Sequence, residues 1–157
     1  MKVFISHKQE DSIIATQLKS EFDRLNISAY LDVLDNDIVK KGKDLTDHIK
    51  LQLNKCSDII VVMSEKTAKS WWVPFEIGMS AQKDMPTVTF LSTNVSLPSY
   101  LEYWPRLKSV SDVSKYVSTR KKYNRRKPIF ESQHYTRSDS IDFSVAEFYA
   151  ELKKELE

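Results

Sequence analysis

The chain has 157 residues, 41 % of them apolar, which suits one domain with a single core. Its 24 Lys and Arg residues nearly balance its 22 Asp and Glu residues, and the net charge of +2 gives no reason to expect a nucleic acid or a membrane as partner. Only two glycines occur, Gly42 and Gly78, so neither a Walker A loop nor a Gly-x-Gly-x-x-Gly nucleotide-binding loop can be written.

The composition also bears on the cellular compartment. Cys56 is the only cysteine, which rules out an intrachain disulfide and favours a reducing environment. No apolar run approaches the roughly 20 residues needed to span a bilayer. Residues 1–6 read as the entry into a strand and not as a signal peptide. We therefore expect a soluble, cytoplasmic protein.

Alternating strand and helix patterns predict the fold. Apolar runs rich in β-branched or aromatic residues predict strands at 3–6, 28–31, 59–63 and 87–91. Apolar residues at helical spacing predict three helices between them, from Asp11 or Ser12 to about Leu25, over about 44–54, and from Pro74 to about Lys83. This order predicts an α/β fold, a flavodoxin-like three-layer sandwich with an approximately five-stranded parallel sheet and helices on both faces.

The pattern weakens after Leu91. Residues 107–110 predict a short fifth strand and 111–117 a short helix. The basic run at 120–127 favours a solvated loop, with an electrostatic patch for an acidic partner or a phosphate as the alternative. A capping box at 144–147 opens a closing amphipathic helix. We expect a domain core at 1–118, with the basic and polar loop and the C-terminal helix of 119–157 packed on the same domain.

A candidate catalytic carboxylate stands in a Trp-x-x-x-Glu pair, Trp72 and Glu76. If the helix starts at Pro74, Glu76 lies in its first turn, where the helix dipole favours an ionised carboxylate. A carboxylate beside a large aromatic surface suits the stabilisation of a cation formed on a sugar. The alternatives are that Glu76 only complements the dipole and that Trp72 only packs in the core.

Three segments should meet at the carboxyl edge of the predicted sheet, where doubly wound folds bind ligands. They are the loop after the first strand (6–11), the long loop after the second (32–43), and the connection after the third that leads to Trp72 and Glu76. No Cys, His and carboxylate spacing predicts a metal site, and no Gly-x-Ser-x-Gly elbow predicts a hydrolase triad.

These motifs resemble the TIR (Toll/interleukin-1 receptor) domain of the bacterial kind. Phe4-Ile5-Ser6-His7 resembles the first strand and its loop, and Leu31-Asp32 with Gly42 resembles the second strand and the BB loop. Ile60-Val61-Val62-Met63-Ser64 resembles the third strand, and Ser70, Trp72 and Glu76 match the Ser-x-Trp and Trp-x-x-x-Glu pattern. The resemblance covers residues 2 to about 118.

The resemblance implies an activity and a site. Many TIR domains cleave NAD⁺ between nicotinamide and ribose and release linear ADP-ribose or a cyclic isomer that serves as an immune signal. The family's catalytic glutamate corresponds to Glu76, and its first loop, here Ser6, His7 and Lys8, supplies substrate contacts. Trp72 would stack on a base or on nicotinamide, or cover the ribose. NAD⁺ is then the substrate and no cofactor is expected.

The resemblance also implies self-association through the BB loop, residues 32–43, which places Lys40 and Gly42 near a shared site. Lys40 and Lys41 depart from the Pro or acidic residues often found ahead of that glycine. A separate sensor or effector protein is expected as a partner, in an antiphage or stress response. Two alternatives stay open: a TIR scaffold that signals without activity, and a nucleoside deoxyribosyltransferase-like enzyme.

Overall fold

The computed structural model covers residues 1–157 and describes 1–31, 43–65, 72–91, 96, 101–131 and 137–157. For Trp72, Phe75 and residues 126–131 and 137–144 it describes the backbone alone.

A parallel sheet forms the middle layer. Its strands are β1 (Lys2–Ser6), β2 (Ser28–Leu31), β3 (Asp58–Val62), β4 (Thr87–Phe90) and β5 (Arg106–Leu107). The strand order is β2-β1-β3-β4-β5, and every neighbouring pair is parallel. Strand order therefore reverses between β1 and β3, and such a switch point is where open α/β sheets bind ligands.

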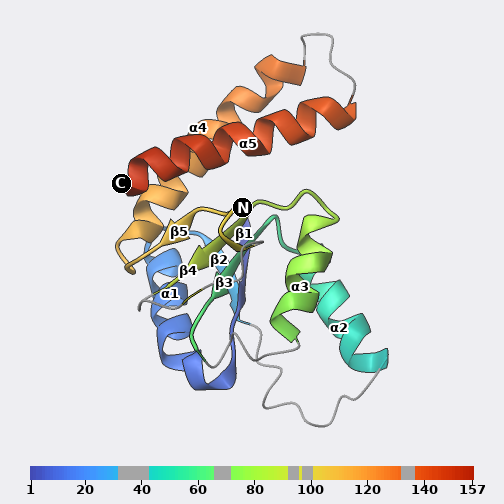
Figure 1. The fold of residues 1–157 in the computed structure, drawn as a ribbon, viewed down its shortest axis with the longest axis vertical. Helices are drawn as coiled ribbons and strands as arrows, with labels where there is room; N and C mark the ends of the chain where they lie inside the picture. Colours follow the sequence, from blue (N-terminus) through green and yellow to red (C-terminus); the bar gives the residue numbers. More distant parts are fainter. Residues whose placement is uncertain (32–42, 66–71, 92–95, 97–100, 132–136) are drawn as a thin grey trace.

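Helices cover both faces of the sheet (Figure 1). They are the 3-10 turn η1 (Gln9–Asp11) and the helices α1 (Ser12–Arg24), α2 (Lys43–Asn54), α3 (Trp72–Ala81), α4 (Asp112–Glu131) and α5 (Arg137–Leu156). Residues of α1, α4 and α5 share one apolar core with alternate residues of the strands, and residues of α2 and α3 share a second core with the others. The flavodoxin-like fold predicted from the sequence is confirmed.

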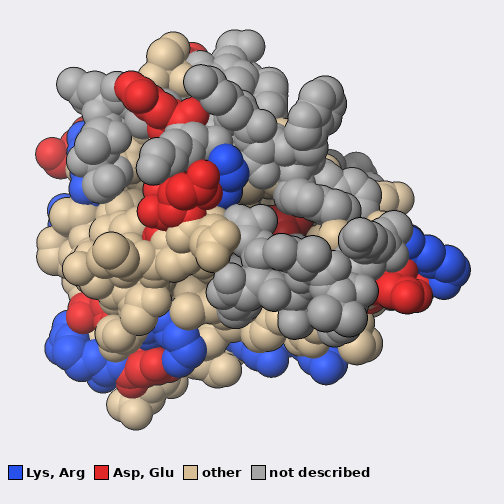
Figure 2. Space-filling view, turned by 90° about the horizontal axis from the view of Figure 1, so that it is seen from below, with Lys and Arg blue, Asp and Glu red and all other residues tan. Residues whose placement is uncertain are grey.

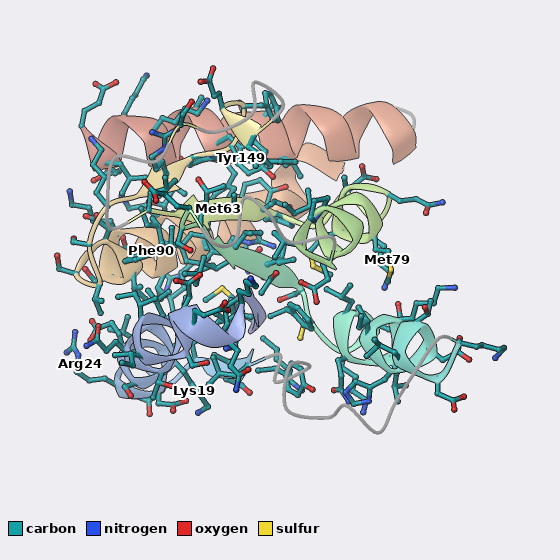
Figure 3. The ribbon with its side chains drawn as sticks, turned by 60° about the horizontal axis from the view of Figure 1, so that its bottom comes forward. Lys19, Arg24, Met63, Met79, Phe90 and Tyr149 are labelled. Atoms are coloured by element: carbon teal, nitrogen blue, oxygen red, sulfur yellow. The ribbon has the colours of Figure 1, made fainter. Side chains whose placement is uncertain are left out.

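Alternation along the strands divides the two cores. Val3 and Ile5 of β1 lie with α1, α4 and α5, whereas Phe4 lies with α2 and α3. Met63 and Phe90 lie in the interior, and Lys19 and Arg24 point outward from α1 (Figure 3). A strand buried on both faces reads as a continuous apolar run, which is why β1 and β3 are plain in the sequence.

The basic run at 120–127 is not a loop, and that prediction is wrong. It lies within α4, whose first half packs against the core through Val113, Tyr116 and Val117. Arg120 points inward, and its Nε donates to Oδ1 of the buried Asp58 at 2.6 Å. The run is therefore partly structural: one of its cations neutralises a carboxylate at the amino end of β3.

The closing helix predicted at the C-terminus is present as α5, but it begins at Arg137, so the capping box predicted to open it at 144–147 lies within the helix. It runs beside α4, and the far ends of the two helices project beyond the sheet (Figure 1). Phe148, Tyr149 and Leu152 are buried in the same core as β1 and β4. None of the helices, searched over the described residues, is long and apolar enough to cross a membrane.

Candidate functional site

Helix α3 begins at Trp72, two residues earlier than predicted. Pro74 is its third residue and still loses no hydrogen bond, because the first four N–H groups of a helix lack intrahelical partners. Glu76 is therefore the fifth residue, and the first turn contains no acidic side chain. The prediction of a first-turn glutamate is wrong, and the helix dipole contributes less to its charge than we expected, because that effect fades beyond the first turn.

What distinguishes Glu76 is the face of α3 on which it lies. Val73, Ile77 and Ser80 occupy the same face at helical spacing, and all three are buried. Glu76 is itself only 2 % exposed. A carboxylate thus occupies a position where this helix otherwise packs on the sheet, and such burial is unfavourable unless the group is hydrogen-bonded.

Ser6 supplies one hydrogen bond to Glu76. Its hydroxyl donates to Oε2 of Glu76 across a separation of 70 residues. Ser6 is the last residue of β1, pairs with Val61 of β3 and is fully buried. Its hydroxyl is therefore held at the switch point of the sheet, facing α3, and any contact of Ser6 with a substrate stays a prediction.

A second polar bridge joins the loop after β1 to the segment after β3. Ser64 Oγ donates to Oδ2 of Asp11 at 2.7 Å. Asp11 holds the N-cap position of α1, as predicted, but its side chain makes no capping bond. This pair was not predicted from the sequence. The pattern that could have predicted it is a serine just after a strand buried on both faces, together with an acidic residue in the loop after the first strand.

The first loop carries the other predicted substrate contacts. His7 Nδ1 lies 3.4 Å from the carbonyl oxygen of Ile5, and Lys8 Nζ lies 3.2 Å from a carboxylate oxygen of Glu10. The Lys8 side chain is about one-third exposed, at 32 %. Ser6, His7 and Lys8 thus follow one another at the carboxyl edge of the sheet. Of these three residues, Ser6 is the one that donates a hydrogen bond to Glu76.

Three predicted site residues are not tested. Lys40 and Gly42 lie outside the described residues, and the side chain of Trp72 does as well. On the described part of the face seen from the carboxyl edge, acidic and basic side chains are mixed (Figure 2). Among the described residues, no group of three or more His, Cys, Asp and Glu could hold a metal ion.

Two surface pockets of about 250 Å³ each flank Trp104. Arg106, Lys108 and Lys153 line one of them, and Met85, Tyr103 and Tyr149 line the other. Neither pocket is lined by Glu76 or by the loop after β1. They are separate from the site built around Glu76.

Comparison with known proteins yields a relative of similar sequence and solved structures of similar fold. The relative, from Cytobacillus dafuensis, bears the name "Putative cyclic ADP-D-ribose synthase TIR2". It is 32 % identical over 85 residues, a stretch that covers 51 % of this chain and 22 % of the relative. The chain thus spans less than a quarter of the length of that protein.

One solved structure of similar fold is that of a 2-deoxyribosyltransferase from the psychrotolerant bacterium Bacillus psychrosaccharolyticus. It superposes with a TM-score of 0.58 at 11 % identity, covering 72 % of this chain and 90 % of that one. At this identity the likeness concerns the fold alone.

The family is given by a sequence model. The model of the TIR domain matches residues 3–127, from β1 into α4. This range contains all of the sheet except Lys2, together with Glu76 and both polar bridges. The chain belongs to the TIR domain family.

Proposed function

We propose that this chain cleaves the bond between nicotinamide and ribose in NAD⁺, with Glu76 as the catalytic carboxylate. The products are nicotinamide and either ADP-ribose, when water accepts the ribosyl group, or a cyclic ADP-ribose isomer, when an atom of the same nucleotide does. One proton is released in either case. No cofactor takes part.

The observation that carries this proposal is the buried carboxylate on the sheet-facing side of α3. Burial of Glu76 costs free energy that an apolar residue at the same position would not. Ser6, from the interior strand β1, and Glu76 meet at the edge where this fold binds ligands. A stability role alone gives no reason for a carboxylate at this position.

The chemistry needs little more than one carboxylate. Nicotinamide leaves a cationic pyridinium as a neutral molecule, so no general acid has to protonate it. The ribose carbon gains positive charge in an oxocarbenium-like transition state, as in glycoside cleavage. A fixed carboxylate stabilises that charge, or holds the ribose hydroxyls, more strongly inside a water-poor site than in bulk water.

The remaining residues are assigned by position. Lys8 and His7, in the loop that follows Ser6, would contact the diphosphate or the ribose, and Trp72 would cover the nicotinamide or the ribose. Lys40 and Gly42 of the BB loop would join the site through a neighbouring subunit. These roles rest on the family resemblance and on the order of the loops.

The name of the Cytobacillus relative supports a nucleotide product of the cyclic ADP-ribose type. We propose that the product acts in the cytoplasm as a signal in antiphage defence, read by a separate effector protein, and that copies of the chain associate through their TIR domains. The share of the relative that is matched, 22 %, leaves its activity a proposal for this chain.

The test is nicotinamide release by the purified chain. NAD⁺ is incubated with high concentrations of the wild type and of Glu76→Gln, with nicotinamide measured by chromatography and the nucleotide product by mass spectrometry. We expect Glu76→Gln, which keeps the size and polarity of the side chain, to lower the rate by about 100-fold or more.

Glu147→Gln is the matched control, because Glu147 is exposed on α5, on the other face of the sheet. Its rate should equal that of the wild type. A folded wild type that releases no nicotinamide, even when crowded or assembled, would contradict the proposal and favour a scaffold that signals by association. Sedimentation of the same samples reports that association directly.

A further inference from the structure

Ser6 differs from an ordinary strand residue in what its hydroxyl contacts. A buried serine side chain commonly bonds to a backbone group of its own element, as Ser80 does in α3, where its Oγ donates to the carbonyl of Ile77 at 2.8 Å. Ser6 instead donates to a carboxylate on another element. Its single hydroxyl proton is therefore committed to Glu76.

The geometry around this bond is fixed from both sides. β1 pairs with β2 on one side and with β3 on the other, so the backbone that carries Ser6 is locked in the sheet. Val73 and Ile77 dock α3 into the core of the opposite face, one on each side of Glu76 in the sequence. The hydroxyl and the carboxylate are thus held by two rigid elements and not by loops.

A hydroxyl donor has two effects on a buried carboxylate. A hydrogen bond to the charged form favours ionisation, which opposes the effect of burial. Hydrogen bonds to charged groups are also stronger than neutral ones, so the bond limits rotation of the carboxylate about its last torsion. Both effects act on Glu76 whether or not a ligand is bound.

We propose that Ser6 is a positioning residue for Glu76, acting on turnover and not on substrate affinity. This inference rests on the proposed function of Glu76. Ser6 contributes through the orientation and charge of that carboxylate, at the moment when the ribose carbon becomes positive. Loss of the hydroxyl removes this hydrogen bond and weakens the constraint on the orientation of the carboxylate.

The test compares Ser6→Ala with Ser80→Ala. Both changes remove one hydroxyl from a fully buried serine, and both serines lie beside α3 or within it. The Ser6 hydroxyl donates to Glu76, whereas the Ser80 hydroxyl donates to the carbonyl of Ile77. We expect Ser6→Ala to lower kcat about 10- to 100-fold, the cost of a misplaced catalytic group. KM should stay within about twofold, since loss of kcat alone marks an interaction made in the transition state. Ser80→Ala should keep both constants within about twofold of the wild type.

Three results would overturn the inference. One is an unchanged kcat in Ser6→Ala while Glu76→Gln is inactive, and another is a raised KM with kcat intact, which would make Ser6 a substrate contact. The third is an equal loss in both alanine variants that follows their folded fractions, measured by thermal melting. If Ser6→Ala does not fold, Ser6→Cys, a near-isosteric and weaker donor, replaces it with the same expectation of a lower kcat.

Failure of the proposed function looks different. In that case the wild type releases no nicotinamide, or Glu76→Gln keeps full activity. The Ser6 inference then falls together with the assignment of Glu76, whereas the three results above leave that assignment intact.

Discussion

Two buried polar side chains, Glu76 and Thr119, differ in their hydrogen bonding. Glu76 accepts a hydrogen bond from Ser6 at the carboxyl edge of the sheet. Thr119, on α4, is fully buried, and its hydroxyl makes no hydrogen bond within the structure described here. An unbonded buried hydroxyl carries a desolvation cost that nothing offsets, so Thr119 is a weak point in the core.

Thr119→Val should therefore stabilise the domain. Valine has the shape of threonine without the hydroxyl, and we expect the free energy of unfolding to rise by about 1 kcal/mol. Chemical denaturation at neutral pH measures the change as a higher midpoint with an unchanged slope.

Thr87→Val is the matched control. Thr87 is equally buried, but its Oγ1 donates to the carbonyl of Met85 at 3.0 Å. The same substitution there should lower the free energy of unfolding by about 1 kcal/mol. Equal effects at both positions would show that the bonding of the hydroxyl does not decide the outcome.

At the scale of elements, α3 combines a buried carboxylate with a helix-interior glycine. Gly78 is exposed, and a Cβ built on it meets no atom within 4 Å. Glycine in a helix interior loses more backbone entropy on folding than alanine does. The position therefore costs stability without any close approach that demands a missing side chain.

We expect Gly78→Ala to raise the free energy of unfolding by about 0.5–1 kcal/mol. Thermal melting measures it, and Ala150→Gly serves as the reverse control, because Ala150 is exposed in the middle of α5. That control should lose a similar amount. A loss of stability in Gly78→Ala would show that this side of α3 is covered in the folded molecule.

Helix α4 shows where sequence patterns stop being informative. Val113, Tyr116 and Val117 mark its first turns, but the next buried residues are polar or charged, Thr119 and Arg120. The Arg120 guanidinium lies over the rings of Tyr123 and Phe148 at 5.0 and 5.5 Å and bonds to Asp58. That partner lies 62 residues away in the sequence. The residues around Arg120 therefore give no sign that its side chain is buried, and the local pattern predicts a solvent-exposed arginine. For this reason the helix was predicted to end too early.

The strands, and the edge of the sheet at which the site lies, could be predicted because their sequence signals are local. The β-branched run at 87–91 and the short run with an aromatic residue at 28–31 are local signals, and parallel strand order follows from alternation with helices. Glu76 was found through its motif, but its hydrogen bond to Ser6 depends on how α3 docks on β1. The start of α3 was misplaced by two residues, because Pro is acceptable anywhere in a first turn and does not mark its first position.

At the scale of the whole molecule, Tyr149 ties the last helix to the sheet. Its hydroxyl accepts a hydrogen bond from the N–H of Thr87, at the start of β4, at 2.8 Å. Burial raises the pKa of Tyr149 to about 12 from an ordinary value of 10.0. Burial, followed by the nearby Asp58 carboxylate, also raises the pKa of Tyr116 well above that value.

These shifts predict a loss of stability at high pH. A raised pKa means that the folded state keeps a proton that the unfolded chain releases above about pH 10, so the contribution is full below pH 10 and is lost as the pH rises to about 12. For Tyr149 the loss is about 2–3 kcal/mol over this window. Denaturant midpoints measured between pH 8 and 12 report it.

Tyr149→Phe isolates the contribution of Tyr149 to this loss of stability at high pH. We expect the variant to be about 1 kcal/mol less stable at pH 8, from the lost hydrogen bond, and to fall less steeply above pH 10. A Tyr149→Phe profile parallel to that of the wild type would contradict the assigned titration.

The position of α5 in the chain has a consequence for synthesis. Phe148 and Leu152 complete a core whose other walls, β1 and α1, leave the ribosome first. Non-local contacts of this kind delay folding until the late segment exists. Glu76 is thus synthesised long before the helix that closes the opposite side of its sheet. A nascent chain still lacking α5 carries the carboxylate but not the complete core on the opposite face of the sheet.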